Sequence, residues 1–281
     1  MDKATPAPRR VTRVQLGILL REWRDRAGLS SKDAADLLEW HPSKLSKVEK
    51  GAARISAAEL DRLLDKYGVP PEEAERMRAL GREARKRGVA GRVPDWARTY
   101  VELEQGADEI KLYDGEMVPG LLQTDEYARA LLATSLIAPP EDAPERAAER
   151  VQRQQRLTSD NPPDLWVVLG EAALHRLVGG RAVLRRQLEW LLELANARNV
   201  SFQILPFSAG EHPALGTQFC LLNFTEPAAT FVYLEGLTDA TYFDRAPHTE
   251  VYARAFRRLL VAAANERESM RMLGDRIEEL S

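Results

Sequence analysis

The chain has few of the features that mark secreted and membrane proteins. It contains a single cysteine, Cys220, among its 281 residues, which excludes a disulfide within the chain. No apolar run approaches the roughly 20 residues that a transmembrane helix needs, and the first residues lack the apolar stretch of a secretory signal. We therefore expect a cytoplasmic protein that spans no membrane, with Cys220 as a buried core thiol.

Signatures of common enzymes are also missing. The sequence holds no Gly-x-Ser-x-Gly, and Gly179-Gly180 follows a helical segment, which is typical of a helix end and not of a phosphate-binding loop. Glu171 and His175 are four residues apart and His212 lies further along, but no additional ligand with recognisable spacing completes a metal site. The sequence therefore predicts a protein that is not an enzyme and that uses no metal or cofactor.

Length and charge divide the chain into two domains. At 281 residues, 44% of them hydrophobic, the chain is long enough to bury two cores. Residues 1–91 carry 20 Lys and Arg against 14 Asp and Glu, whereas residues 92–281 carry 20 against 29. A basic first domain on an acidic body is typical of a protein that binds a polyanion at one end.

Residues 29–51 predict two short helices joined by a tight turn. A cap at Ser30 or Ser31 begins the first helix, which runs to about residue 38. The second helix begins near residue 41 and ends before Gly51. Four apolar positions have the spacing of a crossing helix pair and are expected to face inward: Ala35, Leu38, Leu45 and Val48.

The outer face of the second helix is small, polar and cationic, and no acidic residue lies on it. A helix that enters the DNA major groove needs such a face, because it must donate to phosphates and base edges without repelling the duplex. The alternative is a helical bundle that only contacts another protein. We predict DNA binding, through Ser31, Lys32, Pro42, Ser43, Lys44, Ser46, Lys47, Lys50 and Arg54.

Residues 12–67 resemble the helix-turn-helix domain of the Cro and phage-repressor type, also called the Xre type. Helices before and after the motif complete an all-α bundle in that family. The resemblance implies that Ser31 binds a phosphate or a base. It also implies that three positions of the second helix contact bases: Pro42, Ser43 and Lys47.

The same resemblance implies an ion pair between Arg24, in the preceding helix, and Glu49, near the end of the second helix of the motif. The sequence departs from the family at the turn, where Glu39 occupies a position that is usually glycine. A left-handed backbone at Glu39 would cost about 1 kcal/mol. This departure concerns the geometry of the turn and leaves the motif intact.

Segments on either side of the motif complete the first domain. Residues 1–11 are basic and rich in Pro and Ala, and we expect either an arm that reaches along DNA or a disordered tail. Residues 12–91 form the helix-turn-helix domain, including a linker helix over about 72–87 and a linker over 82–92. The second domain is then residues 92–281.

The second domain has the pattern of an α+β domain, in which a small sheet is covered by helices. Periodicity predicts a helix over residues 96–113 and further helices after it, among them residues 143–157, 183–197, 249–264 and 266–280. About four strands are expected, over residues 165–169, 200–205, 217–224 and 230–234.

Four segments of this domain, taken in order, resemble landmarks of one family; they are residues 118–124, 170–174, 203–207 and 233–236. The family is the WhiJ-like group, which comprises actinobacterial helix-turn-helix regulators with a C-terminal domain of unassigned activity. The resemblance covers nearly the whole chain. It implies a transcriptional regulator that is often paired with a small protein encoded by an adjacent gene, and it supplies neither a catalytic residue nor a ligand.

Aromatic and titratable side chains of the second domain suit a groove for a partner or a small molecule, and they suit a domain core equally well. The candidates are Glu171, His212, Tyr233 and Glu235.

We therefore predict a nucleoid-associated, sequence-specific transcriptional regulator. It is expected to bind operator DNA as a homodimer, because one recognition helix contacts too few base pairs. The second domain is expected to bind the small protein encoded by the adjacent gene or a small-molecule effector. The alternatives are an antitoxin-like scaffold that mainly holds a partner and binds DNA for autoregulation, and a hydrolase with a regulatory DNA-binding arm.

Overall fold

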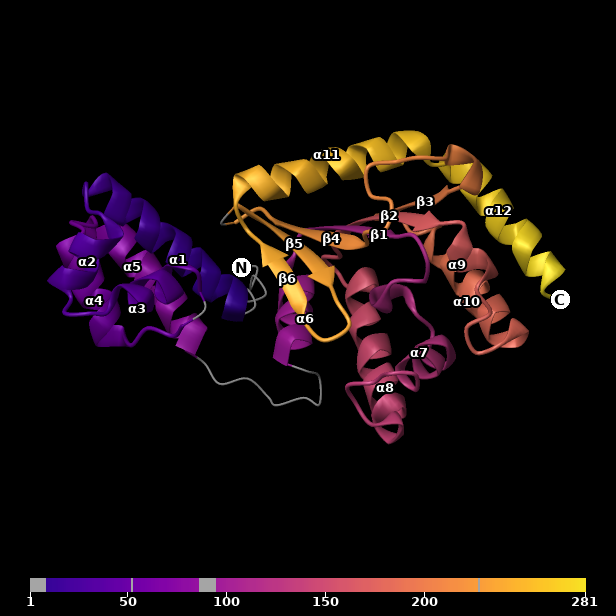
Figure 1. The fold of residues 1–281 in the computed structure, drawn as a ribbon, viewed down its shortest axis with the longest axis horizontal. Helices are drawn as coiled ribbons and strands as arrows, with labels where there is room; N and C mark the ends of the chain where they lie inside the picture. The colour runs from indigo at the N-terminus through magenta and orange to yellow at the C-terminus, as the bar shows by residue number, and fades with distance from the viewer. Residues whose placement is uncertain (1–8, 52, 86–94, 227) are drawn as a thin grey trace. The chain divides into compact units, whose positions relative to one another are not determined.

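The computed structural model describes residues 9–51, 53–85, 95–226 and 228–281. These residues divide into two compact units, one helical and one built around a sheet (Figure 1). The described part of the first unit runs to Arg85 and also includes Arg98–Gly106, and the second unit contains Ala107–Ser281. A segment just beyond the predicted boundary at residues 91 and 92 thus groups with the first unit.

The first unit is an all-α bundle, as predicted. Its helices are α1 (Arg9–Arg26), α2 (Ser31–Leu37), α3 (Pro42–Glu49), α4 (Ala57–Lys66), α5 (Pro71–Arg85) and most of α6 (Asp95–Gly106). Leu20, Leu45 and Leu63 lie at the centre of one apolar core, each with no exposed surface. Helix α1 begins at Arg9, inside the predicted basic arm, and the rest of the arm and most of the predicted linker lie outside the described residues.

The second unit contains a sheet with helices on both of its faces. Its strands are β1 (Glu109–Asp114), β2 (Asp164–Gly170), β3 (Val200–Leu205), β4 (Phe219–Phe224), β5 (Ala229–Glu235) and β6 (Ala240–Phe243). Its α-helices are α7 (Asp125–Leu132), α8 (Ala143–Gln154), α9 (Ala172–His175), α10 (Arg181–Leu194), α11 (Ala246–Ala262) and α12 (Glu266–Glu279). Short 3-10 turns are η1 (Gly120–Leu122), η2 (Pro140–Asp142), η3 (Gln155–Thr158) and η4 (Phe207–Ala209).

The six strands form one mixed sheet in the order β3-β2-β1-β4-β5-β6. Helices connect β1 to β2 and β2 to β3, so these neighbours pair in parallel, whereas β4, β5 and β6 follow one another closely and pair antiparallel. Strand β1 joins the two halves, because it pairs parallel with β2 and antiparallel with β4. As a result β1, β2, β3 and β5 all end at one side of the sheet, which we call the carboxyl edge. The predicted α+β class is confirmed.

The predicted helix over residues 96–113 is wrong in its second half. Helix α6 ends at Gly106, and Glu109–Asp114 forms β1 in the middle of the sheet. Ile110 and Leu112 alternate with polar residues, which suits a strand, and pairing with neighbours on both sides satisfies the backbone of β1. Strand β6 was also missed, so the sheet has six strands and not about four.

Alternate strand residues face opposite sides of the sheet. Tyr113, Val168 and Phe219 are aligned in register and pack with Phe256 and Leu259 of α11. The intervening residues face the opposite side, where α7, α8 and α10 lie (Figure 1). Both faces of the sheet are therefore covered by helices, which leaves the strand ends and the loops after them as the parts of the sheet nearest the surface.

The outer edge of β3 is closed by the junction between α11 and α12. The backbone N–H of Ile204 donates to the hydroxyl of Ser269 at 2.9 Å, and the carbonyl of Ile204 accepts from the backbone N–H of Ala264 at 2.9 Å. The amide of Gln203 donates to the carbonyl of Ala264 at 2.9 Å. The two bonds of Ile204 satisfy backbone groups of β3 that a further strand would otherwise pair with.

Candidate functional site

Helices α2 and α3 are the two helices predicted over residues 29–51, and each has a side-chain cap. Ser30, and not Ser31, caps α2, because its hydroxyl accepts from the backbone N–H of Asp33 at 3.1 Å. His41 caps α3, where its Nδ1 accepts from the backbone N–H of Ser43 at 3.3 Å. Both caps satisfy backbone donors that the helix itself leaves free.

The turn between the two helices keeps a left-handed residue at the position usually held by glycine. Glu39 has a φ of +57°, and among the described residues no other non-glycine residue has a positive φ. The N–H of Trp40 donates to the carbonyl of Ala35 at 2.8 Å, and that of Glu39 donates to the carbonyl of Asp36 at 3.1 Å. This is a Schellman ending, so Glu39 carries the strain that a glycine would avoid.

The inward face of the motif is buried as predicted. Ala35 and Leu45 have no exposed surface, and Leu38 and Val48 retain 2% and 3%. Two glycines bring α1 against the end of α3: a Cβ on Gly17 would lie 2.4 Å from the carbonyl oxygen of Glu49. A Cβ on Gly51 would lie 2.7 Å from the side chain of Val14. The lack of side chains at these two glycines therefore lets the backbone of α1 contact the end of α3 directly.

Arg24 and Glu49 form the predicted ion pair. Nε of Arg24 lies 2.7 Å from Oε1 of Glu49 and a second nitrogen lies 3.3 Å from Oε2, with only 7% of either side chain exposed. The guanidinium also donates to the carboxylate of Asp25 at 2.7 Å and to the carbonyl of Leu29 at 2.8 Å. The hydrogen bond to Glu49 is the main reason that the pKa of Arg24 is raised. The pair fixes the end of α3 relative to α1.

The outer face of α3 remains open. Pro42, Ser43 and Lys47 are exposed, and so are Lys50 and Arg54 beyond it. Ser31 and Lys32, at the start of α2, are exposed too, and Ser46 is half-buried. Within the described ranges, Lys47, Lys50 and Arg54 take part in no ion pair within 4.0 Å. The motif therefore presents uncompensated cations beside small polar groups.

Lys44 differs from the other predicted DNA-binding residues because it already has partners. Its ammonium lies 2.5 Å from the carboxylate of Glu59 in α4 and 4.1 Å from the ring centroid of Trp40. The hydrogen bond from Lys44 lowers the pKa of Glu59 to about 2, with help from the backbone N–H of Ser56. Lys44 thus connects α3 to α4 and to the turn before α3. Ser43 also has a partner, since its hydroxyl lies 2.8 Å from Nδ1 of His41.

The structure brings the four candidates of the second domain to the carboxyl edge, but in separate groups. Glu171, after β2, accepts from the backbone N–H of Phe207 at 2.7 Å and lies 3.8 Å from His175. His212, in the loop between β3 and β4, lies 3.4 Å from the hydroxyl of Tyr113. No described contact joins these two groups, and among the described residues Glu171, His175 and His212 do not come together as a group that could hold a metal ion.

Tyr233 and Glu235, at the end of β5, form the third group. Glu235 accepts a hydrogen bond from Tyr233, and its charge also acts on Asp114 at the end of β1. Burial raises the pKa of both Tyr233 and Asp114. Asp114 faces the side of α7, whereas its neighbour Tyr113 faces α11, so the sheet separates this group from His212. The predicted groove is therefore not a single site.

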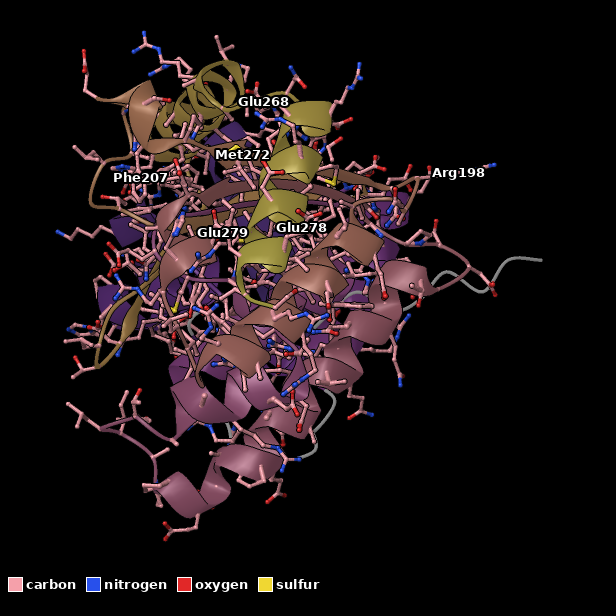
Figure 2. All side chains as sticks on the ribbon, turned by 90° about the vertical axis from the view of Figure 1, so that its right-hand side faces the viewer. Arg198, Phe207, Glu268, Met272, Glu278 and Glu279 are labelled. Atoms are coloured by element: carbon pink, nitrogen blue, oxygen red, sulfur yellow. The ribbon has the colours of Figure 1, made fainter. Side chains whose placement is uncertain are left out.

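Exposed apolar side chains surround these groups along the carboxyl edge. They lie in the loops that follow β2, β3 and β5, and their exposed fractions are 50% for Leu177, 66% for Phe207, 71% for Leu215 and 87% for Leu237. Figure 2 shows Phe207 at the surface, far from Arg198. Charged groups lie among them, including Arg176, which pairs with Glu116. The edge is thus a mixed apolar and polar surface.

The segment at residues 118–124, which carried much of the resemblance, is structural. The amide of Gln187 (0% exposed) accepts from the backbone N–H of Thr124 at 2.7 Å and donates to the carbonyl of Leu122 at 2.8 Å. Gln123 donates to the carbonyl of Val118 at 2.7 Å and accepts from Arg150 at 2.5 Å. These side-chain amides satisfy backbone N–H and C=O groups of the turn between β1 and α7. The segment therefore has a structural role in fixing this turn.

Tyr113 and Asp114 were missed as site residues because the segment up to residue 113 was assigned to a helix, which hid the strand that ends at Asp114. Their position after alternating apolar residues in Glu109–Asp114 is the signal that indicates a strand ending at the site. Burial raises the pKa of Tyr113 to about 12, and Asp114 is only 7% exposed. Both are therefore largely buried residues at the end of β1, one on each face of the sheet.

Comparison with known families finds one model within the first unit and a second model that covers most of α6 together with nearly all of the second unit. A helix-turn-helix domain model matches residues 15–77, so the first unit is of the class that binds DNA. The model described as "Domain of unknown function (DUF5753)" matches residues 97–275, and the chain belongs to that family. No curated protein gives a significant match. Over the described residues, no helix combines the length and apolar character that crossing a bilayer requires.

Proposed function

We propose that this protein is a sequence-specific transcriptional regulator that binds operator DNA as a homodimer. The observation that carries the proposal is the open cationic face of α3, held in place by the buried pair of Arg24 and Glu49. Lys47 is assigned to guanine acceptors or a phosphate, and Ser43 to a base edge or a phosphate. Ser31 and Lys32 are assigned to the DNA backbone. Two copies are needed because one helix reads too few base pairs.

The proposal includes a role for the second domain, which is to bind a small partner protein encoded by an adjacent gene, or else a small ligand. The exposed apolar side chains along the carboxyl edge, Phe207 and Leu237 among them, support a protein partner. The four landmark segments support membership of the WhiJ-like group of actinobacterial regulators. The proposal assigns the protein a cytoplasmic, nucleoid-associated location and no catalytic role.

Lys47→Ala and Ser43→Ala should each weaken binding to a duplex selected from a random pool by about 1–3 kcal/mol if the side chains touch base edges. A role at phosphates only would weaken all sequences alike and lower the salt slope by about one. Gel-shift titrations at two salt concentrations distinguish these results. Lys66→Ala is the matched control, since Lys66 is exposed at the end of α4, away from α3. Losses no greater than in the control would contradict the placement of α3 in the groove.

If the second domain is a sensor, its partner must change the operator affinity of the full chain, by about 1–3 kcal/mol in a typical case. The measurement is DNA affinity during titration with the small protein encoded next to this chain. Phe207→Ala should weaken binding of that partner, while Leu136→Ala, an equally apolar change at a 97% exposed residue before α8, should not. Unchanged DNA affinity with the partner demonstrably bound would remove the sensor and favour the antitoxin-like scaffold.

A further inference from the structure

The outer face of α11 carries three arginines that no described carboxylate neutralises. Arg254, Arg257 and Arg258 are exposed, and none of them takes part in an ion pair within 4.0 Å among the described residues. Arg257 and Arg258 follow Arg254 by about one helical turn, and all three lie on the side opposite to Phe256 and Leu259, which pack into the core. We call Arg254, Arg257 and Arg258 the arginine stripe.

The arginine stripe stands out against the rest of its domain. Residues 92–281 carry 29 acidic residues against 20 basic ones, so their net charge is negative. Six other arginines of this domain are matched with carboxylates; the pairs are Arg129–Asp125, Arg176–Glu116, Arg185–Glu189, Arg186–Glu126, Arg271–Asp275 and Arg276–Glu279. Further exposed arginines without an ion pair among the described residues lie singly, whereas those of the stripe lie within one turn of one helix; the single ones are Arg181, Arg198, Arg245 and Arg267. Glu250 is the one acidic residue of α11, and it lies one turn before Arg254 on the same face of the helix, but it forms no ion pair with Arg254 within 4.0 Å. The stripe is therefore a local positive surface on an acidic body.

We propose that the arginine stripe of α11 binds the phosphate backbone of the duplex that the helix-turn-helix domain holds. The inference rests on the proposed function and adds a second, sequence-independent contact to it. Guanidinium groups bind phosphate oxygens through paired hydrogen bonds, and duplex DNA is the densest linear polyanion that a DNA-binding chain meets. Because both domains are in one chain, the first contact raises the effective concentration of DNA at the second.

The test is the salt dependence of non-specific binding by the full chain. The probe is a random-sequence duplex of about 40 base pairs, roughly four helical turns, so that it extends past the helix-turn-helix domain. Affinity is measured by fluorescence anisotropy between about 50 and 200 mM salt. The variant Arg254→Gln/Arg257→Gln/Arg258→Gln should lower the salt slope by about 0.9 for each phosphate that an arginine no longer neutralises. For three phosphates, the ratio of affinities at the two salt concentrations shrinks about 40-fold.

Two further variants make the result specific. Arg185→Gln/Arg198→Gln/Arg271→Gln removes the same charge from exposed residues on other helices and loops, and it should leave the slope of the natural chain unchanged. Arg254→Lys/Arg257→Lys/Arg258→Lys keeps the charge and should retain most of the slope, which separates an effect of charge on DNA binding from a failure to fold.

Three outcomes would overturn the proposal. A glutamine variant whose slope equals that of the control would show that the stripe does not contact DNA while leaving the proposed function intact. An unchanged slope combined with loss of binding to the adjacent gene's protein would assign the stripe to an acidic protein. No duplex binding by the natural chain would overturn the proposed function together with this inference.

Discussion

Replacing Glu49 by Ala should lower the free energy of unfolding of the first unit by about 3–5 kcal/mol. The reason is that Arg24, whose side chain is only 7% exposed, would keep its charge in a buried place without the carboxylate that now bonds it at two nitrogens. Chemical denaturation of the full chain, followed by far-ultraviolet circular dichroism, measures the change.

Asp25→Ala is the matched control for this prediction. Asp25 also accepts from Arg24, but 56% of its side chain is exposed, so its loss should change stability by no more than about 1 kcal/mol. A double variant, Arg24→Met/Glu49→Leu, should recover much of the loss because it removes both buried charges together. If Glu49→Ala unfolds like the natural chain, the pair does not hold α1 and α3 together.

Gly17→Ala should destabilise the first unit by about 1–3 kcal/mol or more, although alanine is the better helix former. A Cβ at Gly17 would lie 2.4 Å from the backbone oxygen of Glu49, and backbone atoms cannot move aside as a flexible side chain can. The end of α3 must therefore shift away from α1. Thermal unfolding reports the loss of stability, and a weaker gel shift reports the displaced recognition helix.

Gly274→Ala makes the same substitution inside helix α12, where a Cβ would meet no atom within 4 Å. It should stabilise the second unit by about 0.5–1 kcal/mol, since glycine costs that much in a helix interior. If Gly17→Ala lowers the free energy of unfolding and Gly274→Ala raises it, the effect at Gly17 comes from the close approach of α3 and not from helix propensity. Stabilisation by both would mean that α1 and α3 do not lie in contact at Gly17.

The helix-turn-helix could be predicted in detail because its signals are local. Caps, helix ends and the inward positions Ala35 and Leu45 depend on spacing within 23 residues, and the structure bears them out. The pairing of Arg24 with Glu49 came from resemblance, since nothing in the spacing of residues so far apart specifies it. The role of Lys44 could not be predicted, because Glu59 reaches it only when α4 packs beside α3.

The carboxyl edge was predicted only in part, and the reason is the geometry of a sheet. Glu171, His212, Tyr233 and Glu235 are all at this edge, but the sequence carries no sign of which face of the sheet each one lies on. Asp114, the buried carboxylate beside Glu235, was missed because the residues before it, which form β1, were assigned to a helix that ended at residue 113.

Local composition was enough to specify a basic helical domain with an outward cationic helix face, since helix ends and amphipathic faces depend on neighbours a few residues away. The second domain depended on distant segments. Pairing of β1 with β2 and β4 made residues 109–114 a central strand, and the alternation of side chains along the strands divided the candidate groove between the two faces of the sheet. Such pairings join residues more than 50 positions apart, so only the folded chain decides which side chains share a site.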